Sequence, residues 1–159
     1  MERKDVSFTH ERPLAPVAGL PEPPSYGTSQ HRFEISVIFT SFDATAAALK
    51  MAGTLVKGLS AHVKLVVPQV VPYPLPLDNP PVLREFCERR LRDITNESPV
   101  DTTVLVYLCR NRLATLRAVL KRGSIVVIGG CRRWWPTPEK SLARKMCRSG
   151  YEVIFTEMD

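Results

Sequence analysis

Basic residues gather in the C-terminal part of the chain, where they could bind an anion. Between Cys109 and Gly150 there are eleven arginines and lysines and one acid, Glu139, so this segment carries +10 against +6 for the whole chain. Such asymmetry favours acidic ligands or partners, and Trp134 and Trp135 offer rings on which nucleic acid bases could stack. Solvated helix faces and helix-dipole pairing explain part of the same charge, so a merely structural role stays open.

No combination of residues predicts catalysis or a metal site. The histidines, His10, His31 and His62, are scattered, and no Ser-His-Asp or paired-carboxylate arrangement accompanies them. The cysteines lack the paired spacing of zinc and redox sites, and we expect them to be free thiols in a reducing, cytoplasmic compartment. They are Cys87, Cys109, Cys131 and Cys147. The sequence therefore predicts no catalytic residue and no metal ligand, and an enzyme is the less favoured class.

Strands and helices alternate from residue 33 onward. Apolar, β-branched runs predict strands, and apolar residues at helical spacing predict the helices between them. The expected strands are 33–41, 62–67, 102–108, 124–128 and 151–156. The expected helices are 44–59, 82–96, 112–121 and 139–148. The prolines from Pro68 to Pro81 predict a long crossing loop, because proline cannot donate a backbone hydrogen bond.

This alternation predicts one α/β domain over residues 33–159. Near-continuous apolar strands favour a doubly wound, five-stranded parallel sheet in the order 3-2-1-4-5, with helices on both faces. The winding reverses between the first and fourth strands, so the crevice beyond their C-terminal ends is the default ligand site. The segments Ser41–Thr45 and Gly129–Ser141 should meet there. Asp43 could act in that site or cap the helix that begins at Ala44.

The order and spacing of these features resemble the universal stress protein family, within the adenine nucleotide alpha hydrolase-like superfamily. Residues 43–45 (Asp-Ala-Thr) are similar to the Asp-Gly-Ser turn after its first strand, and residues 66–67 are similar to its second strand. Residues 126–129 (Val-Val-Ile-Gly) are similar to the strand end that opens its nucleotide loop, and Ser141 falls near the hydroxyl residue of its last helix. The resemblance implies a Rossmann-like fold, a stress-response role and, in some members, bound ATP or AMP.

The chain departs from the glycine pattern of the ATP-binding members. That pattern is G-x2-G-x9-G-[S/T], in which glycines let the backbone approach the phosphates. Counted from Gly129, the second glycine position holds Arg132 and the third holds Leu142, and Ser141 is preceded by Lys140 instead of glycine. The resemblance therefore supports the architecture more strongly than it supports nucleotide binding.

Three functions stay open on this basis. The first is a regulatory or binding module with a degenerate nucleotide crevice, and the second is an ATP or AMP binder with slow or no hydrolysis. The third is a binder of nucleic acid or another acidic partner through the basic C-terminal half. In the second, Arg132, Arg133 and Lys140 would contact the anion by charge. The candidate binding residues are Asp43, Thr45, Val67, Gly129, Gly130, Arg132, Arg133, Lys140 and Ser141. Trp134 and Trp135 are expected to plug the crevice or form a subunit contact in preference to serving as a ligand platform.

The remaining expectations concern the ends of the chain and its surroundings. Residues 1–32 contain five prolines without a sustained apolar period, which predicts a disordered tail. The strand 151–156 should lie at a sheet edge and pair with a second copy, giving a homodimer. No apolar run approaches the roughly 20 residues that span a bilayer, so no membrane partner is expected.

Overall fold

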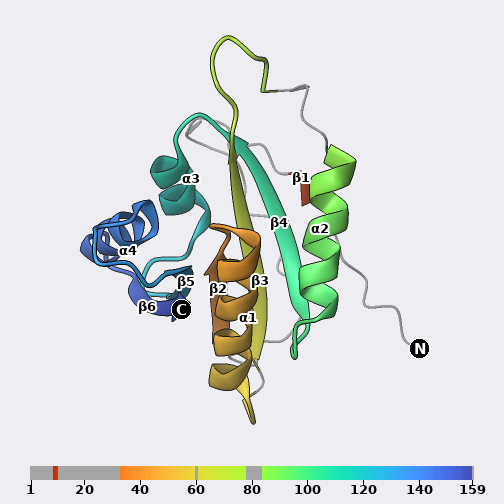
Figure 1. Cartoon of the computed structure of the whole chain (residues 1–159), viewed down its shortest axis with the longest axis vertical. Coiled ribbons are helices and arrows are strands. Elements are labelled where there is room, and N and C mark those ends of the chain that lie inside the picture. The colour runs from red at the N-terminus through yellow and green to blue at the C-terminus, as the bar shows by residue number, and fades with distance from the viewer. Residues whose placement is uncertain (1–8, 11–32, 60, 78–83, 159) are drawn as a thin grey trace, which may run out of the picture.

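The computed structural model describes residues 9–10, 33–59, 61–77 and 84–158, and it contains one parallel sheet (Figure 1). The strands are β1 (Thr9–His10), β2 (Phe33–Ile38), β3 (Ala61–Val70), β4 (Thr102–Cys109), β5 (Ile125–Cys131) and β6 (Glu152–Met158). The helices are α1 (Phe42–Val56), α2 (Arg84–Asn96), α3 (Arg112–Val119) and α4 (Pro138–Arg148). The sheet order is β1-β4-β3-β2-β5-β6. The predicted five-stranded order 3-2-1-4-5 is confirmed by β2 to β6.

The sheet gains a sixth, two-residue strand from the segment that the sequence predicts as a disordered tail. Thr9 and His10 pair in parallel with Leu105 and Val106 of β4. The other residues of that segment, 1–8 and 11–32, lie outside the described residues. The strand β1 therefore adds an edge that the sequence pattern did not indicate.

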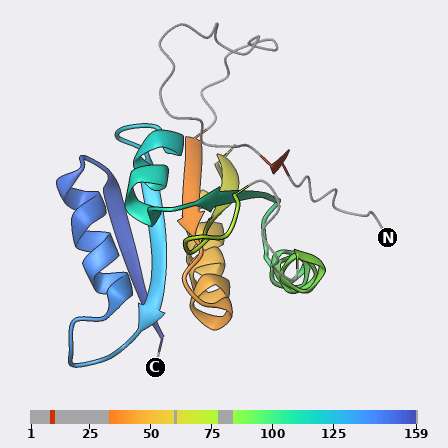
Figure 2. The same cartoon turned by 90° about the horizontal axis from the view of Figure 1, so that it is seen from above.

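Two hydrophobic cores lie on the two faces of the sheet, as the nearly continuous apolar strands require. Alternate residues of each strand point to opposite faces, so Val37 packs under α1 and α2 while Ile38 packs under α3 and α4. Figure 2 shows the helices arranged around the sheet from above. Because both faces are covered, the central strands can be apolar throughout.

The strand β3 runs further than predicted and includes Pro68, which was expected to lie in the crossing loop. The backbone N–H of Phe39 donates to the carbonyl of Val66, and that of Val71 donates to the carbonyl of Cys109. Alternation along the strand therefore turns the nitrogen of Pro68 toward the β2 side, where the next bond of the ladder would have gone to the carbonyl of Phe39. That carbonyl accepts from Arg112 Nη2 instead, which is why a proline is tolerated inside this strand.

Two helices, α1 and α4, begin earlier than predicted because their capping residues lie earlier in the sequence. Helix α1 begins at Phe42, and the Ser41 hydroxyl accepts a hydrogen bond from the Ala44 amide at 3.4 Å. Asp43 therefore lies within the first turn and is not the cap. Helix α4 begins at Pro138, where Thr137 is the cap. A hydroxyl cap followed by proline at the first helical position is a signal that the sequence did carry.

Candidate functional site

The crevice expected at the reversal of winding is occupied by the first turn of α1. A Cβ atom on Gly129 would lie 1.9 Å from the carbonyl oxygen of Ala44, so helix backbone and strand backbone are in direct contact. The Thr40 hydroxyl donates to the carbonyl of Gly129 at 2.8 Å. The Thr40 amide in turn donates to the hydroxyl of buried Thr45 at 3.2 Å. Gly129 and Thr45 thus hold α1 against β5.

Both glycines of the expected nucleotide loop belong to a strand. The strand predicted to end at Ile128 continues to Cys131, and the Arg132 amide extends the ladder by donating to the Met158 carbonyl at 2.7 Å. A Cβ atom on Gly130 would meet the ring of Phe155 at 2.6 Å. The absence of a side chain at Gly129 and Gly130 therefore serves packing in the described structure.

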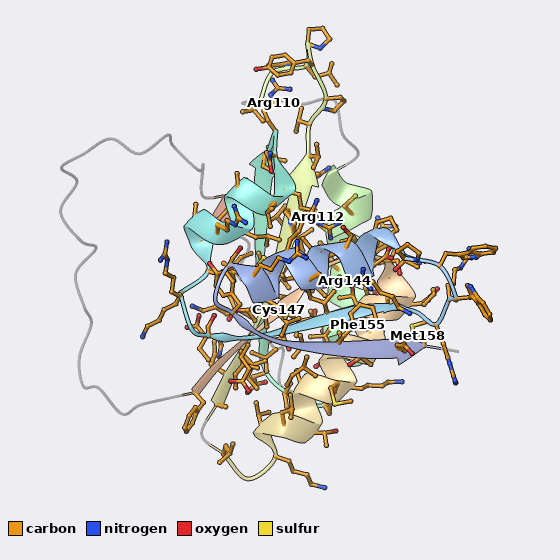
Figure 3. All side chains as sticks on the ribbon, turned by 90° about the vertical axis from the view of Figure 1, so that its left-hand side faces the viewer. Arg110, Arg112, Arg144, Cys147, Phe155 and Met158 are labelled. Atoms are coloured by element: carbon orange, nitrogen blue, oxygen red, sulfur yellow. The ribbon has the colours of Figure 1, made fainter. Side chains whose placement is uncertain are left out.

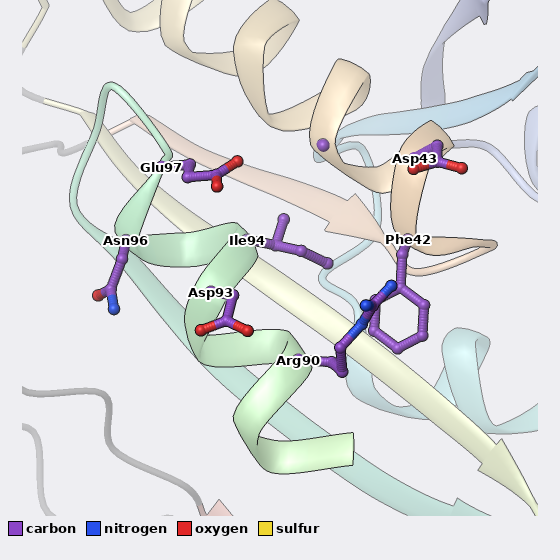
Figure 4. Close-up of a pocket in the computed structure, with 8 residues that line it drawn as sticks. Phe42, Asp43, Arg90, Asp93, Ile94, Asn96 and Glu97 are labelled. Atoms are coloured by element: carbon purple, nitrogen blue, oxygen red, sulfur yellow. The ribbon is translucent and has the colours of Figure 1, made fainter. Parts of the chain in front are cut away.

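Asp43 faces a different part of the surface, a groove of about 460 Å³ between α1 and α2 (Figure 4). The groove is lined at one end by Phe42 and by Arg90, whose guanidinium carbon lies 4.6 Å from the centre of the Phe42 ring. Asp93 contributes a second carboxylate. Val67, also predicted for the site, is buried in the core beneath these helices. The predicted site residues are thus divided between a core, a groove and the β5–α4 region.

Lys140 makes contacts within the protein that engage its charge. Its Nζ atom lies 2.8 Å from Glu157 Oε1 and donates to the carbonyl of Arg133 at 3.1 Å. The hydrogen bond from Lys140 lowers the pKa of the Glu157 carboxyl, and the charge of Arg132 acts in the same direction. Ser141 lies within α4 and not at its start, and its amide donates to the Thr137 carbonyl. Lys140 therefore ties the loop before α4 to β6.

Arg112 lies at the carboxyl edge of the sheet, and no sequence motif singled it out. It is the first residue of α3 (Figure 3), and its Nη2 atom donates to the carbonyl of Phe39, the residue after β2. Burial lowers the pKa of the guanidinium, whereas Glu139 and Cys109 favour its charged form. Its buried Nε atom has no hydrogen-bond partner among the described residues. The guanidinium thus links the start of α3 to the carboxyl end of β2, one of the two strands between which the sequence predicted the crevice.

Arg110 has a corresponding role in the segment that follows β3. Its two terminal nitrogens donate to the carbonyls of Val71 at 2.8 Å and Leu75 at 2.6 Å. Its guanidinium carbon lies 4.1 Å from the centre of the Tyr73 ring. Arg110, Arg112 and Lys140 are therefore engaged by contacts within the protein at the carboxyl edge of the sheet.

The other eight C-terminal basic residues are exposed. They lie on α3 or directly after it, in the loop before α4, and on α4 itself. They are Arg117, Lys121, Arg122, Arg132, Arg133, Arg144, Lys145 and Arg148. In the same loop, Trp134 is 96% exposed and Trp135 is 69% exposed. The expectation that the tryptophans plug the crevice is therefore wrong, because a plug would bury both rings. We call residues 132–136 the Trp loop.

The chemistry that these residues support is binding. No group of three or more histidine, cysteine or acidic side chains among the described residues could hold a metal ion. Burial raises the pKa of the Cys109 thiol, which disfavours the reactive thiolate. What the surface presents instead is guanidinium and ammonium groups beside two indole rings.

The contact of Gly129 with Ala44 predicts that a methyl group added at residue 129 destabilises the protein more than one added at residue 130. We expect Gly129→Ala to lower the free energy of unfolding by about 3 kcal/mol, since the α1 backbone itself would have to move. Gly130→Ala serves as the matched control, with a loss of about 1 kcal/mol, because the end of the Phe155 side chain can shift. Urea denaturation measures both values. Equal losses would contradict the assignment of Gly129 to the α1–β5 contact.

The filled crevice also predicts the response to nucleotide. We expect millimolar ATP or AMP to leave the thermal unfolding midpoint unchanged, since α1 occupies the space beside Gly129. A nucleotide present at about 100 times its dissociation constant would add about 2.7 kcal/mol to the stability. Calorimetric titration checks the same point without heating. A stoichiometric, saturable heat with ATP would show that the crevice opens to admit it.

Comparison with known proteins adds no relative to this picture. No family model matches the chain, and no curated protein matches it. Among the described helices, none combines the length and the apolar character needed to cross a membrane.

Proposed function

We propose that this chain is a non-enzymatic binding module on a universal-stress-protein-like scaffold, and that its partner is single-stranded nucleic acid. The observation that carries the proposal is the pair of exposed indoles at Trp134 and Trp135, directly preceded by the exposed Arg132 and Arg133. Adjacent exposed tryptophans are unusual without a partner, and bases stack on such rings irrespective of sequence.

The distribution of charge supports an anionic partner. Helix α4 leads away from the Trp loop and carries Arg144, Lys145 and Arg148 on its exposed surface. Its eleven residues extend over about 16 Å, which lengthens the positive surface beyond the loop. Arg117, on α3, donates through Nε to the hydroxyl of Ser149 at 2.8 Å, so the ends of the two helices lie together. A strand that begins on the indoles can therefore follow the basic surface of α4.

The exposed rings favour a single strand over a duplex. Bases in a duplex are stacked on each other, and their faces are open only where they are unpaired. The basic residues contact phosphates and confer salt dependence without selecting a sequence. The module is thus expected to bind with little sequence preference.

Fluorescence anisotropy with a labelled oligo-dT tests the stacking contribution. We expect Trp134→Ala and Trp135→Ala each to weaken binding by about 10- to 100-fold, in line with about 1–3 kcal/mol per stacked base. The indole fluorescence of the native protein should be quenched on binding. Native affinity in the double tryptophan variant would refute the proposal.

The charge contribution has a matched control on the opposite side of the sheet. Replacing Arg144 and Lys145 by glutamine should make the slope of log K against log salt shallower by about 1.4, since each phosphate contact on a single strand contributes about 0.7. Replacing two exposed lysines, Lys50 of α1 and Lys57 at its C-cap, by glutamine should leave the slope unchanged. Similar changes in both variants would indicate general attraction to a basic protein and not a site on α4.

A homodimer through β6 is a second proposal, carried by the edge position of that strand. The Glu152 amide donates to Ser124, and the Met158 carbonyl accepts from Arg132, so even-numbered residues of β6 face β5. The backbone groups of Val153, Phe155 and Glu157 therefore point outward at the end of the sheet. A second copy could pair with this row and complete its hydrogen bonds.

Hydrogen exchange on the full chain tests this pairing. We expect the outward amides of Val153, Phe155 and Glu157 to become more protected as the protein concentration rises. The inward amides of Ile154 and Thr156 provide the control, because β5 already protects them at any concentration. Concentration-independent exchange of the outward amides, together with a monomer mass in sedimentation, would exclude the dimer.

A further inference from the structure

A carboxylate lies within the basic surface formed by the Trp loop and α4. The Oε1 atom of Glu157, near the end of β6, lies 2.8 Å from the Nζ atom of Lys140 in the first turn of α4. The same ammonium group donates to the carbonyl of Arg133 at 3.1 Å, directly before the two indoles. Glu157 thus brings a negative charge to the place where the Trp loop meets α4.

The surroundings of this carboxylate favour an anion. The hydrogen bond from Lys140 lowers the pKa of the Glu157 carboxyl, and the charge of Arg132 acts in the same direction. Helix α4 has eleven residues, and its dipole adds partial positive charge at its first turn, where Lys140 lies. The Thr137 hydroxyl accepts from the Lys140 amide at 3.3 Å and so fixes this turn. An ammonium group, a guanidinium charge and a helix N-terminus therefore all stabilise a negative charge here.

The ion pair between Lys140 and Glu157 can exchange its carboxylate for another anion. The side chain of Glu157 is 41% exposed, and that of Lys140 is 24% exposed. Exposed ion pairs contribute little to stability, because water solvates both charges and two long side chains must be held in one geometry. A phosphate oxygen accepts a charge-assisted hydrogen bond from lysine as a carboxylate does. A phosphate that approaches Lys140 can therefore displace Glu157 at little cost.

We infer that Lys140 and the first turn of α4 form a phosphate subsite, which Glu157 occupies in the free protein and leaves when a nucleic acid strand binds. The carbonyl to which Lys140 donates belongs to the peptide group that leads into Trp134, so the subsite adjoins the indoles. The inference rests on the proposed function for the identity of the ligand. It adds that the chain weakens its own binding, because Glu157 competes with the strand for Lys140.

Oligo-dT binding to Glu157→Gln tests this competition. We expect the dissociation constant to fall by about 2- to 5-fold at low salt, as the loss of one exposed ion pair implies. The slope of log K against log salt should steepen by about 0.7, since one more phosphate contact then releases counterions. The matched control is Glu152→Gln, an equal change of charge on an exposed residue at the other end of β6, which should leave the slope unchanged.

A second variant assigns the effect to Lys140. Adding Lys140→Gln to Glu157→Gln should abolish the steeper slope, and a slope that stays steep would overturn the inference. An equal steepening in Glu152→Gln would overturn it as well, since the effect would then be one of net charge. If the ion pair serves instead to hold the Trp loop in place, Glu157→Gln will weaken oligo-dT binding, and the inference is wrong.

Pyrophosphate tests the subsite without nucleic acid. We expect it to shift the amide NMR signals of Arg133 and Lys140 at lower concentration in Glu157→Gln than in the native protein, with Glu152→Gln behaving as the native protein does. Equal titrations of Glu157→Gln and the native protein would overturn the subsite, whatever the result with oligo-dT. If pyrophosphate behaves as expected and oligo-dT does not bind, the proposed function fails and the subsite stands.

Discussion

The close approach of the α1 backbone to β5 determines what this fold can offer as a site. A parallel sheet places its natural crevice where the winding reverses, beside the first turn of the helix that follows the central strand. Here Gly129 lets the carbonyl of Ala44 come to within contact of the strand. Thr40 and Thr45 then fix the turn by hydrogen bonds. A glycine at this position could let a phosphate approach the strand backbone. Here the first turn of α1 makes that close approach instead, and it occupies the crevice.

With that crevice occupied, the basic residues of the C-terminal part fall into two groups, those that contact the sheet edge and those that are exposed. Arg110 and Arg112 are bound to carbonyl groups at the carboxyl ends of the strands, and Lys140 is paired with Glu157. These three contact the protein itself at the carboxyl edge of the sheet. The exposed ones lie along α3, α4 and the Trp loop, on the surface that we propose as the binding site.

The sequence predicted the sheet well because its signals are local and repeated. Apolar strands alternate with helices, and the handedness of the crossovers leaves few orders for five strands. It failed where a contact between distant segments decides the outcome. The strand β5 extends to Cys131 because β6 continues beside it, and Pro68 is tolerated because Arg112 donates to the Phe39 carbonyl in its place. The roles of Gly129 and Arg112 likewise depend on Ala44 and Phe39, which no spacing within their own segments reveals.

The long reach of β3 has a consequence for access to the molecule. Four residues of β3 continue past the level at which β2 ends, and β4 accompanies them to Cys109 (Figure 1). The strands β5 and β6 also continue past this level, by three residues, to Cys131 and Met158. The carboxyl edge of the sheet therefore has a notch at β2. Arg110 holds the segment that follows β3 on one side of the notch, and Lys140 holds the Trp loop on the other. The end of β2, where Arg112 donates to Phe39, is thus recessed between two longer pairs of strands.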